Sequence, residues 1–230
     1  LFACVAPHAL GVSAAGAFLG ALASALLVFF VSLYAGASRL TIVLAGMALT
    51  SIFTAGMNAI LIFNPDAYVN SSGFLVGSLS GVIASELVIP GCVICVGLFV
   101  AAGQGTRLNI LSLGDEGAHA LGLNVQRTRL ILLSLAALLA GAAVSFAGLI
   151  GFVGLVVPHI VRFFVGHDNR RVLLLSPVAG AIVVCACDTV ARTLFAPFEI
   201  PVGICMALIG GPFFIYLILR SRKGEVDGRS

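Results

Sequence analysis

Long apolar stretches separated by short polar breaks make up most of the chain. Each stretch has about the 20 residues that an α-helix, rising about 1.5 Å per residue, needs to cross about 30 Å of membrane hydrocarbon. The pattern predicts helices over residues 12–34, 40–63, 84–102, 128–149, 173–195 and 201–219. It therefore favours an all-α fold, a polytopic bundle of membrane helices.

The composition agrees with this prediction. Of the 230 residues, 60% are hydrophobic and 9% are charged, whereas soluble domains carry about 25% charged residues. The mean hydropathy is +1.19. Because so apolar a chain has too few polar side chains to cover its surface in water, we expect a lipid bilayer to surround it.

The placement of the basic residues predicts the orientation. They gather near residue 39, at 104–129, at 166–171 and in the C-terminal tail, whereas the breaks at 64–72 and 196–200 contain none. Short loops rich in Lys and Arg stay in the cytoplasm. We therefore expect the first set of breaks and the C-terminus to be cytoplasmic, and the other two breaks to be extracytoplasmic.

The segment 151–162, GFVGLVVPHIVR, must return the chain to the cytoplasm. The predicted helix 128–149 ends outside, yet Arg170 and Arg171 belong to a cytoplasmic break. A helix of about a dozen residues covers only about 18 Å. We therefore predict a short helix over 152–165 that is buried among other helices rather than facing lipid.

Five residues distinguish this segment. Gly151 and Gly154 continue a three-residue glycine spacing that lets neighbouring backbones approach closely. Pro158 removes one helical hydrogen bond and leaves a carbonyl for neighbours to satisfy. We expect His159 to hydrogen-bond such a carbonyl or another neighbour, rather than to bind a metal or act in catalysis. Arg162 is expected to anchor the segment at the inner side.

The break at 104–127 contains the most polar pattern of the chain, LSLGDEGAHALGLNV. Asp115 and Glu116 begin a short helical run, where carboxylates interact favourably with the helix dipole. Gly122 can end that run. Two interpretations are open: a short helix that lies against a partner surface, or a solvated connecting loop.

Two arginines stand at predicted helix ends. Arg192 is the only basic residue near an outer helix end, and it follows Asp188 by four residues, so an ion pair within one helix is one interpretation. Arg39 precedes the helix 40–63 at its cytoplasmic side, where it can serve as an interfacial anchor.

Motifs of common enzymes are absent from the sequence. It has no GxxxxGK[ST], HExxH or GxSxG, so we expect no enzyme activity and no ATP hydrolysis by this chain. Cys92 and Cys95 form a CxxC without the second ligand pair that a zinc site needs. We expect no metal, no cofactor and no nucleic-acid partner. An ion-coupled secondary transporter, which uses broken helices, is an alternative of another class.

Three motifs together resemble a known family. They are Leu113-Gly114-Asp115 with Ala118 and Leu121-Gly122-Leu123; GFVGLVVPHIVR followed by DNRR; and CDTVAR followed by EIPVGICMALIGGPFFIYLIL. In this combination residues 111–220 resemble the permease subunits of binding-protein-dependent ABC importers for iron-siderophores, haem and vitamin B12. A secondary transporter has no need of the first motif.

The resemblance implies a shortened chain. Members of this family usually have ten membrane helices, whereas this chain has about seven, one of them short, and begins near the end of the third. We therefore expect an N-terminal truncation; alternatively, PHALGVSAAGA corresponds to an earlier family motif with a deletion behind it. Residues 1–230 then form a single permease domain with a cytoplasmic coupling loop, 104–127, and a cytoplasmic tail, 220–230.

The resemblance also implies function and partners. Two permease subunits, identical or different, form the pathway in the inner membrane, cytoplasmic ATP-binding subunits drive it, and an extracytoplasmic binding protein delivers the substrate. Ferric siderophores are the favoured substrates, with haem and cobalamin as alternatives. The implied ATPase-coupling residues are Leu113, Gly114, Asp115, Glu116, Ala118, Leu121 and Gly122. Arg192 is implied in binding-protein docking, and Ser38, Arg39 and Thr41 in the inner gate.

Overall fold

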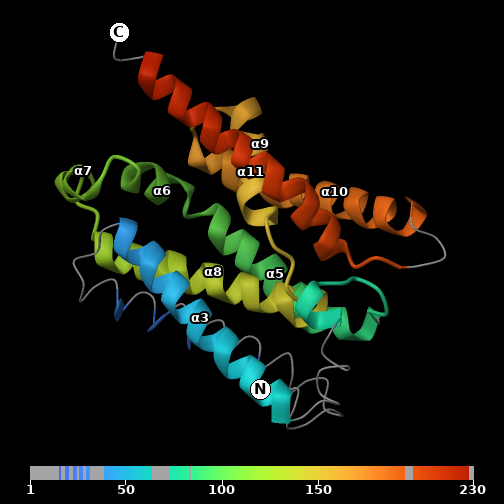
Figure 1. Cartoon of the computed structure of the whole chain (residues 1–230). Helices are drawn as coiled ribbons and strands as arrows, with labels where there is room; N and C mark the ends of the chain where they lie inside the picture. Colours follow the sequence, from blue (N-terminus) through green and yellow to red (C-terminus); the bar gives the residue numbers. More distant parts are fainter. Residues whose placement is uncertain are drawn as a thin grey trace. The chain divides into compact units, whose positions relative to one another are not determined.

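The computed structural model describes residues 39–63, 73–82, 84–194 and 199–227, with nine scattered positions between 16 and 31. The helices with defined bounds are α3 (Arg39–Phe63), α5 (Ala84–Ala102), α6 (Gly105–Leu111), α7 (Asp115–Ala120), α8 (Val125–Ala147), α9 (Val153–Val165), α10 (Asn169–Leu194) and α11 (Val202–Asp227) (Figure 1). These described residues contain no strand. The predicted all-α class is confirmed.

Most predicted helices are found within a few residues of their expected ends. The stretches 40–63 and 84–102 correspond to α3 and α5, and the short segment 152–165 corresponds to α9. The stretch expected at 12–34 lies largely outside the described residues. The predicted C-terminal end of the last helix, residue 219, was wrong, because α11 continues to Asp227. The Arg and Lys residues that follow the apolar stretch are good helix formers, and no proline ends the helix there.

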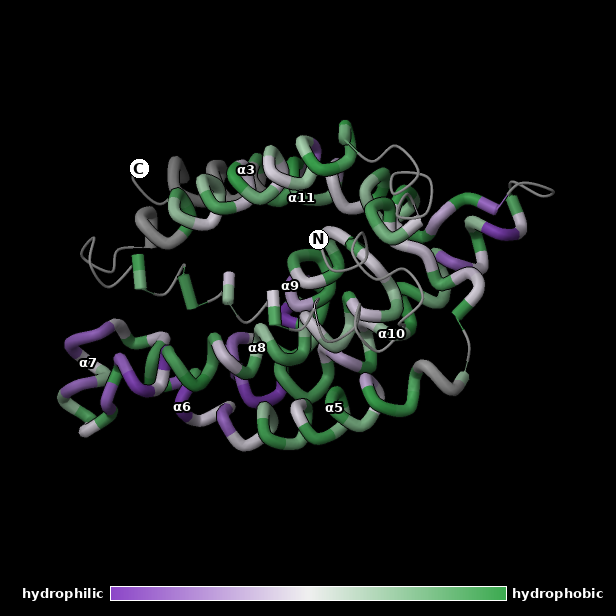
Figure 2. The backbone as a smooth tube through the Cα atoms, turned by 90° about the horizontal axis from the view of Figure 1, so that it is seen from below, coloured by the Kyte–Doolittle hydropathy of each residue, from purple (hydrophilic) through white to green (hydrophobic). Residues whose placement is uncertain are grey.

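The described helices differ in their ability to cross a bilayer. Residues Val43–Phe63, Val125–Ala147 and Asn169–Leu194 are long and apolar enough to span it. Leu87–Ala102 and Gly105–Leu111 meet the same criteria only as a pair bent by 54°, while Val153–Val165 and Val202–Leu217 are shorter apolar helices. Figure 2 shows the apolar residues along α5 and the polar residues gathered at α7. Three or four spans are thus found in the described ranges, against about seven membrane helices, one of them short, that the sequence pattern predicts for the whole chain.

The chain forms two compact units, the first of which comprises residues 1–75 and 81–148. Within it α5 packs against α8. Gly97 lies in this contact: a Cβ there would be 2.6 Å from Leu139 Cδ2. At the end of α8, Gly148 has a φ of 70°, and a Cβ there would be 2.5 Å from the Phe74 carbonyl oxygen. Glycines therefore allow the close contacts of this unit.

The second unit comprises residues 76–80 and 149–230. Here α9 and α10 bury Val157, Val161 and Val172 between them, and α10 and α11 bury a second cluster. That cluster consists of Cys187, Ala191, Val202, Cys205 and Met206. Both clusters are made of small and branched apolar side chains, which allow closely packed helices.

The entry into α9 is a strained turn. Phe152 precedes the helix with a φ of 64°, the only described residue other than glycine with a positive φ. A Cβ on Gly210 of α11 would lie 2.7 Å from Phe152 Cγ, so the aromatic ring rests directly on that glycine. Packing against Gly210 therefore accompanies a backbone conformation that a bulky side chain rarely adopts.

Candidate functional sites

The predicted helical run in the loop 104–127 is confirmed as α7. Its end is fixed by two hydrogen bonds: Gly122 N–H donates to the His119 carbonyl at 2.9 Å, and Leu123 N–H donates to the Ala118 carbonyl at 3.0 Å. Gly122 has a φ of 77°. This pair of bonds around a left-handed glycine is the Schellman motif that terminates many helices. Gly122 thus ends α7, as predicted.

The surface of α7 is divided between packing and exposure. Ala118 is fully buried, at 0% exposure, whereas Glu116 is exposed. Leu113 and Leu121, on either side of the helix, are 65% and 61% exposed. The loop therefore presents two large exposed apolar side chains, one before and one after α7.

An ion pair that the sequence did not indicate fixes the start of α7. Arg129 Nη2, on α8, lies 2.7 Å from Asp115 Oδ1. The two residues are fourteen apart in sequence, so helical spacing alone could not have paired them. Arg129 is therefore a functional candidate that sequence reasoning missed.

The α9 segment meets its predictions only in part. One face is buried, with Val156, Val157 and Val161 below 6% exposure, but Leu155, Phe163 and Phe164 are more than half exposed. The short helix is confirmed and one of its faces is buried, while the expectation that it does not face lipid stays a prediction. Pro158 lies inside the helix as expected.

The other predicted residues of this segment lie in open positions. A Cβ on Gly151 or Gly154 would meet no atom within 4 Å, so the close backbone approach is made at Gly148 and not at these two. His159 is exposed and forms no hydrogen bond with any described residue, so its predicted bond is not found. Arg162 Nη2 donates to Asn169 Oδ1 at 3.3 Å and thereby links the end of α9 to the start of α10.

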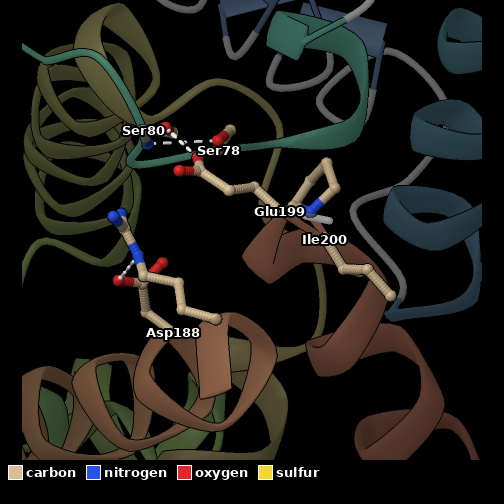
Figure 3. Close-up of a pocket in the computed structure, with 7 residues that line it drawn as sticks. Ser78, Ser80, Asp188, Glu199 and Ile200 are labelled. Atoms are coloured by element: carbon tan, nitrogen blue, oxygen red, sulfur yellow. Dashed lines mark hydrogen bonds and ion pairs between the residues drawn. The ribbon is translucent and has the colours of Figure 1, made fainter. Parts of the chain in front are cut away.

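A polar pocket lies in the second unit where α10 ends and α11 begins. It is lined by Ser78, Ser80, Asp188, Arg192, Glu199, Ile200 and Pro201 (Figure 3). Arg192 Nε donates to Asp188 Oδ2 at 2.8 Å, and the Arg192 side chain remains 43% exposed. The ion pair that the four-residue spacing allowed is therefore present.

The pocket also holds residues that the sequence did not single out. Ser80 Oγ donates to Glu199 Oε2 at 2.5 Å, as the dashed line in Figure 3 shows. Glu199 is the only acidic residue in the break 196–200, which was the one available signal. Its hydrogen-bond partner Ser80 lies 119 positions away in the sequence, and no sequence pattern pointed to it.

Residues 76–80, which we name the strap, run across the start of α11. The Gly77 carbonyl accepts from Gly203 N–H at 3.0 Å. A Cβ on Gly203 would overlap the Val76 carbonyl oxygen, and one on Gly77 would lie 2.7 Å from the Leu149 carbonyl oxygen. The strap is therefore held by backbone contacts that tolerate only glycine at both positions.

The expected gate residues stand at the beginning of α3. Arg39 is its first residue and Thr41 lies in its first turn, while Ser38 lies outside the described residues. Among the described residues no group of three or more His, Cys, Asp or Glu side chains is placed to hold a metal ion.

Comparisons with known proteins agree on one family. The chain is 41% identical to the hemin transport system permease protein HmuU of Yersinia pestis over 215 residues, which are 90% of this chain and 63% of that protein. It is 41% identical to the cobalamin import system permease protein BtuC of Halobacterium salinarum, covering 90% and 56%. Against the iron(3+)-hydroxamate import system permease protein FhuB of Bacillus subtilis the identity is 39%, covering 82% and 49%.

A solved structure and a family profile extend this result. A transporter assigned to the metal-chelate type of ABC transporter, in an inward-facing conformation, superposes with a TM-score of 0.76 and 28% identity, covering 93% of this chain and 75% of that one. The chain thus spans roughly half to two thirds of the length of the curated relatives it matches. Residues 2–220 match the profile of the FecCD transport family. The chain therefore belongs to the FecCD transport family.

Proposed function

We propose that the chain is a membrane-spanning permease subunit of an ATP-driven importer for metal chelates, haem or cobalamin. Family membership and the transport functions carried by the names of its relatives support this proposal. The ATP is hydrolysed on separate cytoplasmic subunits, and the chain alternates access of a central pathway. Its single permease domain pairs with a second permease subunit, identical or different.

The observation that carries the proposal is the geometry of the loop 104–127. Leu113 and Leu121 expose large apolar surfaces on both sides of a helix whose end is firmly terminated. Such a surface fits a groove on a partner protein, and we assign it to the ATPase subunit. Glu116 lies on the exposed part of this surface, while Gly114, Ala118 and Gly122 shape the helix beneath it.

The variant Leu121→Asp tests this assignment. A carboxylate in an apolar groove carries a desolvation cost, so we expect the ATPase subunits no longer to co-purify with the permease and ATP-driven uptake to fall at least tenfold. Gln126→Asp, on an exposed position at the start of α8, is the control for added charge and should leave both unchanged. Unchanged co-purification and uptake in Leu121→Asp would refute the assignment.

The polar pocket around Arg192 fits a binding protein. The Arg192 guanidinium is 43% exposed although it pairs with Asp188, so it retains donors for a carboxylate on an approaching protein. We expect Arg192→Glu to weaken docking and a reversed charge on the binding protein to restore it. Asp188→Asn serves as the control, because it removes the internal pair without changing the sign at Arg192. Docking that is insensitive to the Arg192 charge would exclude this role.

The proposed topology places the loop 104–127 and the tail from 220 in the cytoplasm of a cell with this chain in its inner membrane. It places the pocket around Arg192 outside and the start of α3, with Ser38, Arg39 and Thr41, at the inner gate. Single cysteines introduced at Gln126 and Glu199, in a variant whose native cysteines are replaced by alanine, are labelled with a membrane-impermeant reagent to check both sides. Labelling of the cysteine at position 126 from outside the cell would show that the topology is the opposite of the proposed one.

Within the substrate class we favour ferric siderophores, with haem and cobalamin as alternatives. Competition for uptake among labelled ferric siderophore, haem and cobalamin distinguishes the three directly. Dependence of uptake on the ATPase subunit separates this proposal from an ion-coupled secondary transporter, whose transport would survive loss of that subunit.

A further inference from the structure

We propose that Arg129 is a positioning residue that holds the start of α7 on α8, so that the Asp115 carboxylate serves this internal pair rather than the ATPase surface. The inference rests on the proposed function of the loop as the ATPase-coupling element. It changes the role of Asp115 from a contact with the partner to a fixed point within the chain, and it gives a role to Arg129, which carried none.

The ion pair is short and directional. Arg129 Nη2 and Asp115 Oδ1 are 2.7 Å apart, the distance of a charge-assisted hydrogen bond. The Arg129 side chain is 29% exposed and the Asp115 side chain 50% exposed. The contact lies at the first residue of α7, and the N-terminal neighbour Gly114 supplies no side-chain cap. The pair therefore fixes the end of α7 that lacks another side-chain restraint.

Isolated helices as short as α7, which has six residues, are not stable in water because nucleation is costly. Three contacts replace the missing stability: the Schellman motif at Gly122, the buried Ala118, and the ion pair at Asp115. The first two restrain the end and the middle of α7. Among the described side chains only the ion pair restrains its beginning, beside the backbone hydrogen bond that Gly114 N–H donates to the Leu111 carbonyl at 3.3 Å. Removing the pair should free the first turn while the rest of the helix stays in place.

Arg129 lies on α8, the membrane helix to which we expect α7 to transmit the motion of the ATPase. It lies near the start of α8, whose first turn is fixed by a hydrogen bond from Arg127 N–H to Asn124 Oδ1 at 3.0 Å. The neighbouring Val125 and Thr128 are buried, and α8 is one of the helices long enough to span the bilayer. A force that a partner applies to α7 therefore reaches a membrane helix through the ion pair and the buried Ala118.

The residues of the loop then divide by role. Leu113, Glu116 and Leu121 are exposed, and Glu116 forms no ion pair with a described residue. These three face the partner, whereas Asp115 and Arg129 face each other. An exposed pair contributes little to overall stability, so its loss should reduce coupling without unfolding the protein.

A charge swap tests this division. We would compare Asp115→Arg, Arg129→Asp and the double variant Asp115→Arg/Arg129→Asp with Arg129→Lys, which keeps the charge. Arg127→Asp is the matched control, because it reverses an exposed charge two positions earlier that forms no side-chain ion pair with the described residues. Two quantities are measured: amide hydrogen exchange of residues 115–122 in the purified chain, and substrate imported per ATP hydrolysed by the complex in proteoliposomes.

Each single reversal should speed exchange at 115–122 about threefold to tenfold and lower the import per ATP by a similar factor, with the double variant and Arg129→Lys close to the wild type. Arg127→Asp should change neither. Exchange that is not restored by the swap would refute the ion-pair restraint. Restored exchange with the import per ATP still lowered in the double variant would return Asp115 to the partner surface and overturn the inference. Failure of the proposed function is distinguished by Leu121→Asp, which would then leave ATPase binding unchanged.

Discussion

The contact between the strap and α11 gives a sharp prediction for Gly203→Ala. Gly203 N–H donates to the Gly77 carbonyl at 3.0 Å. A methyl group at this position would overlap the Val76 carbonyl oxygen and lie 3.0 Å from its carbon. Since these are backbone atoms and not the end of a flexible side chain, the strap must move away from α11.

The expected cost follows from two contributions. Overpacking a closely packed site costs about 1–3 kcal/mol, and losing the hydrogen bond to Gly77 costs about 1 kcal/mol. Alanine recovers up to about 1 kcal/mol by its better helix propensity. The free energy of unfolding should therefore fall by about 1–4 kcal/mol. At about 2–4 °C per kcal/mol for a chain of this size, the melting temperature falls by about 2–16 °C.

Gly211→Ala is the matched control in the same helix. A Cβ there would meet no atom within 4 Å, so this variant should be as stable as the wild type or more stable by up to about 1 kcal/mol. Thermal unfolding of the purified chain in detergent, followed by size-exclusion chromatography, compares the three proteins. If Gly203→Ala melts no lower than Gly211→Ala, the strap is not held against α11 as described.

Three further outcomes concern other sites. Ala118→Leu should destabilise α7 by about 1–3 kcal/mol because Ala118 is fully buried, whereas Ala120→Leu, at an exposed position, should have little effect; hydrogen exchange at 115–122 measures both. Gly122→Ala should lower the stability of the end of α7 by about 1–2 kcal/mol, because Gly122 has a φ of 77°. Hydrogen exchange of the Leu123 amide should become faster, and unchanged exchange would contradict the Schellman termination. Arg192→Ala should change the free energy of unfolding by less than about 1 kcal/mol, as an exposed pair contributes little, yet lower binding-protein affinity; a large loss of stability would show that its role is structural.

Local sequence patterns predicted the helices well. The apolar stretches 40–63 and 84–102 and the short segment 152–165 became α3, α5 and α9, because length and hydrophobicity determine membrane helices strongly. Gly122 ended α7 and Arg192 paired with Asp188, since both depend on residues no more than five positions apart.

Contacts between distant positions could not be predicted in this way. Arg129 with Asp115, and Ser80 with Glu199, are brought together by helix packing and by the path of the strap. The glycine spacing at Gly151 and Gly154 predicted close contacts that the described chain makes at other glycines, because spacing shows where a backbone can be approached but not which neighbour approaches it. His159 shows the same limit, since its exposure depends on the orientation of α9.

The strap also has a consequence for the order of synthesis. Residues 76–80 leave the ribosome long before Gly203, with which Gly77 forms its hydrogen bond. At a synthesis rate of about 5–20 residues per second, Gly203 is made on the order of ten seconds after the strap. During that interval the Gly77 carbonyl lacks the hydrogen-bond donor that it has in the folded chain, and the second unit cannot complete its packing until α11 has been made. The C-terminal helices therefore depend for their completion on a segment translated far ahead of them, and a fragment starting after Ser80 would lack that segment.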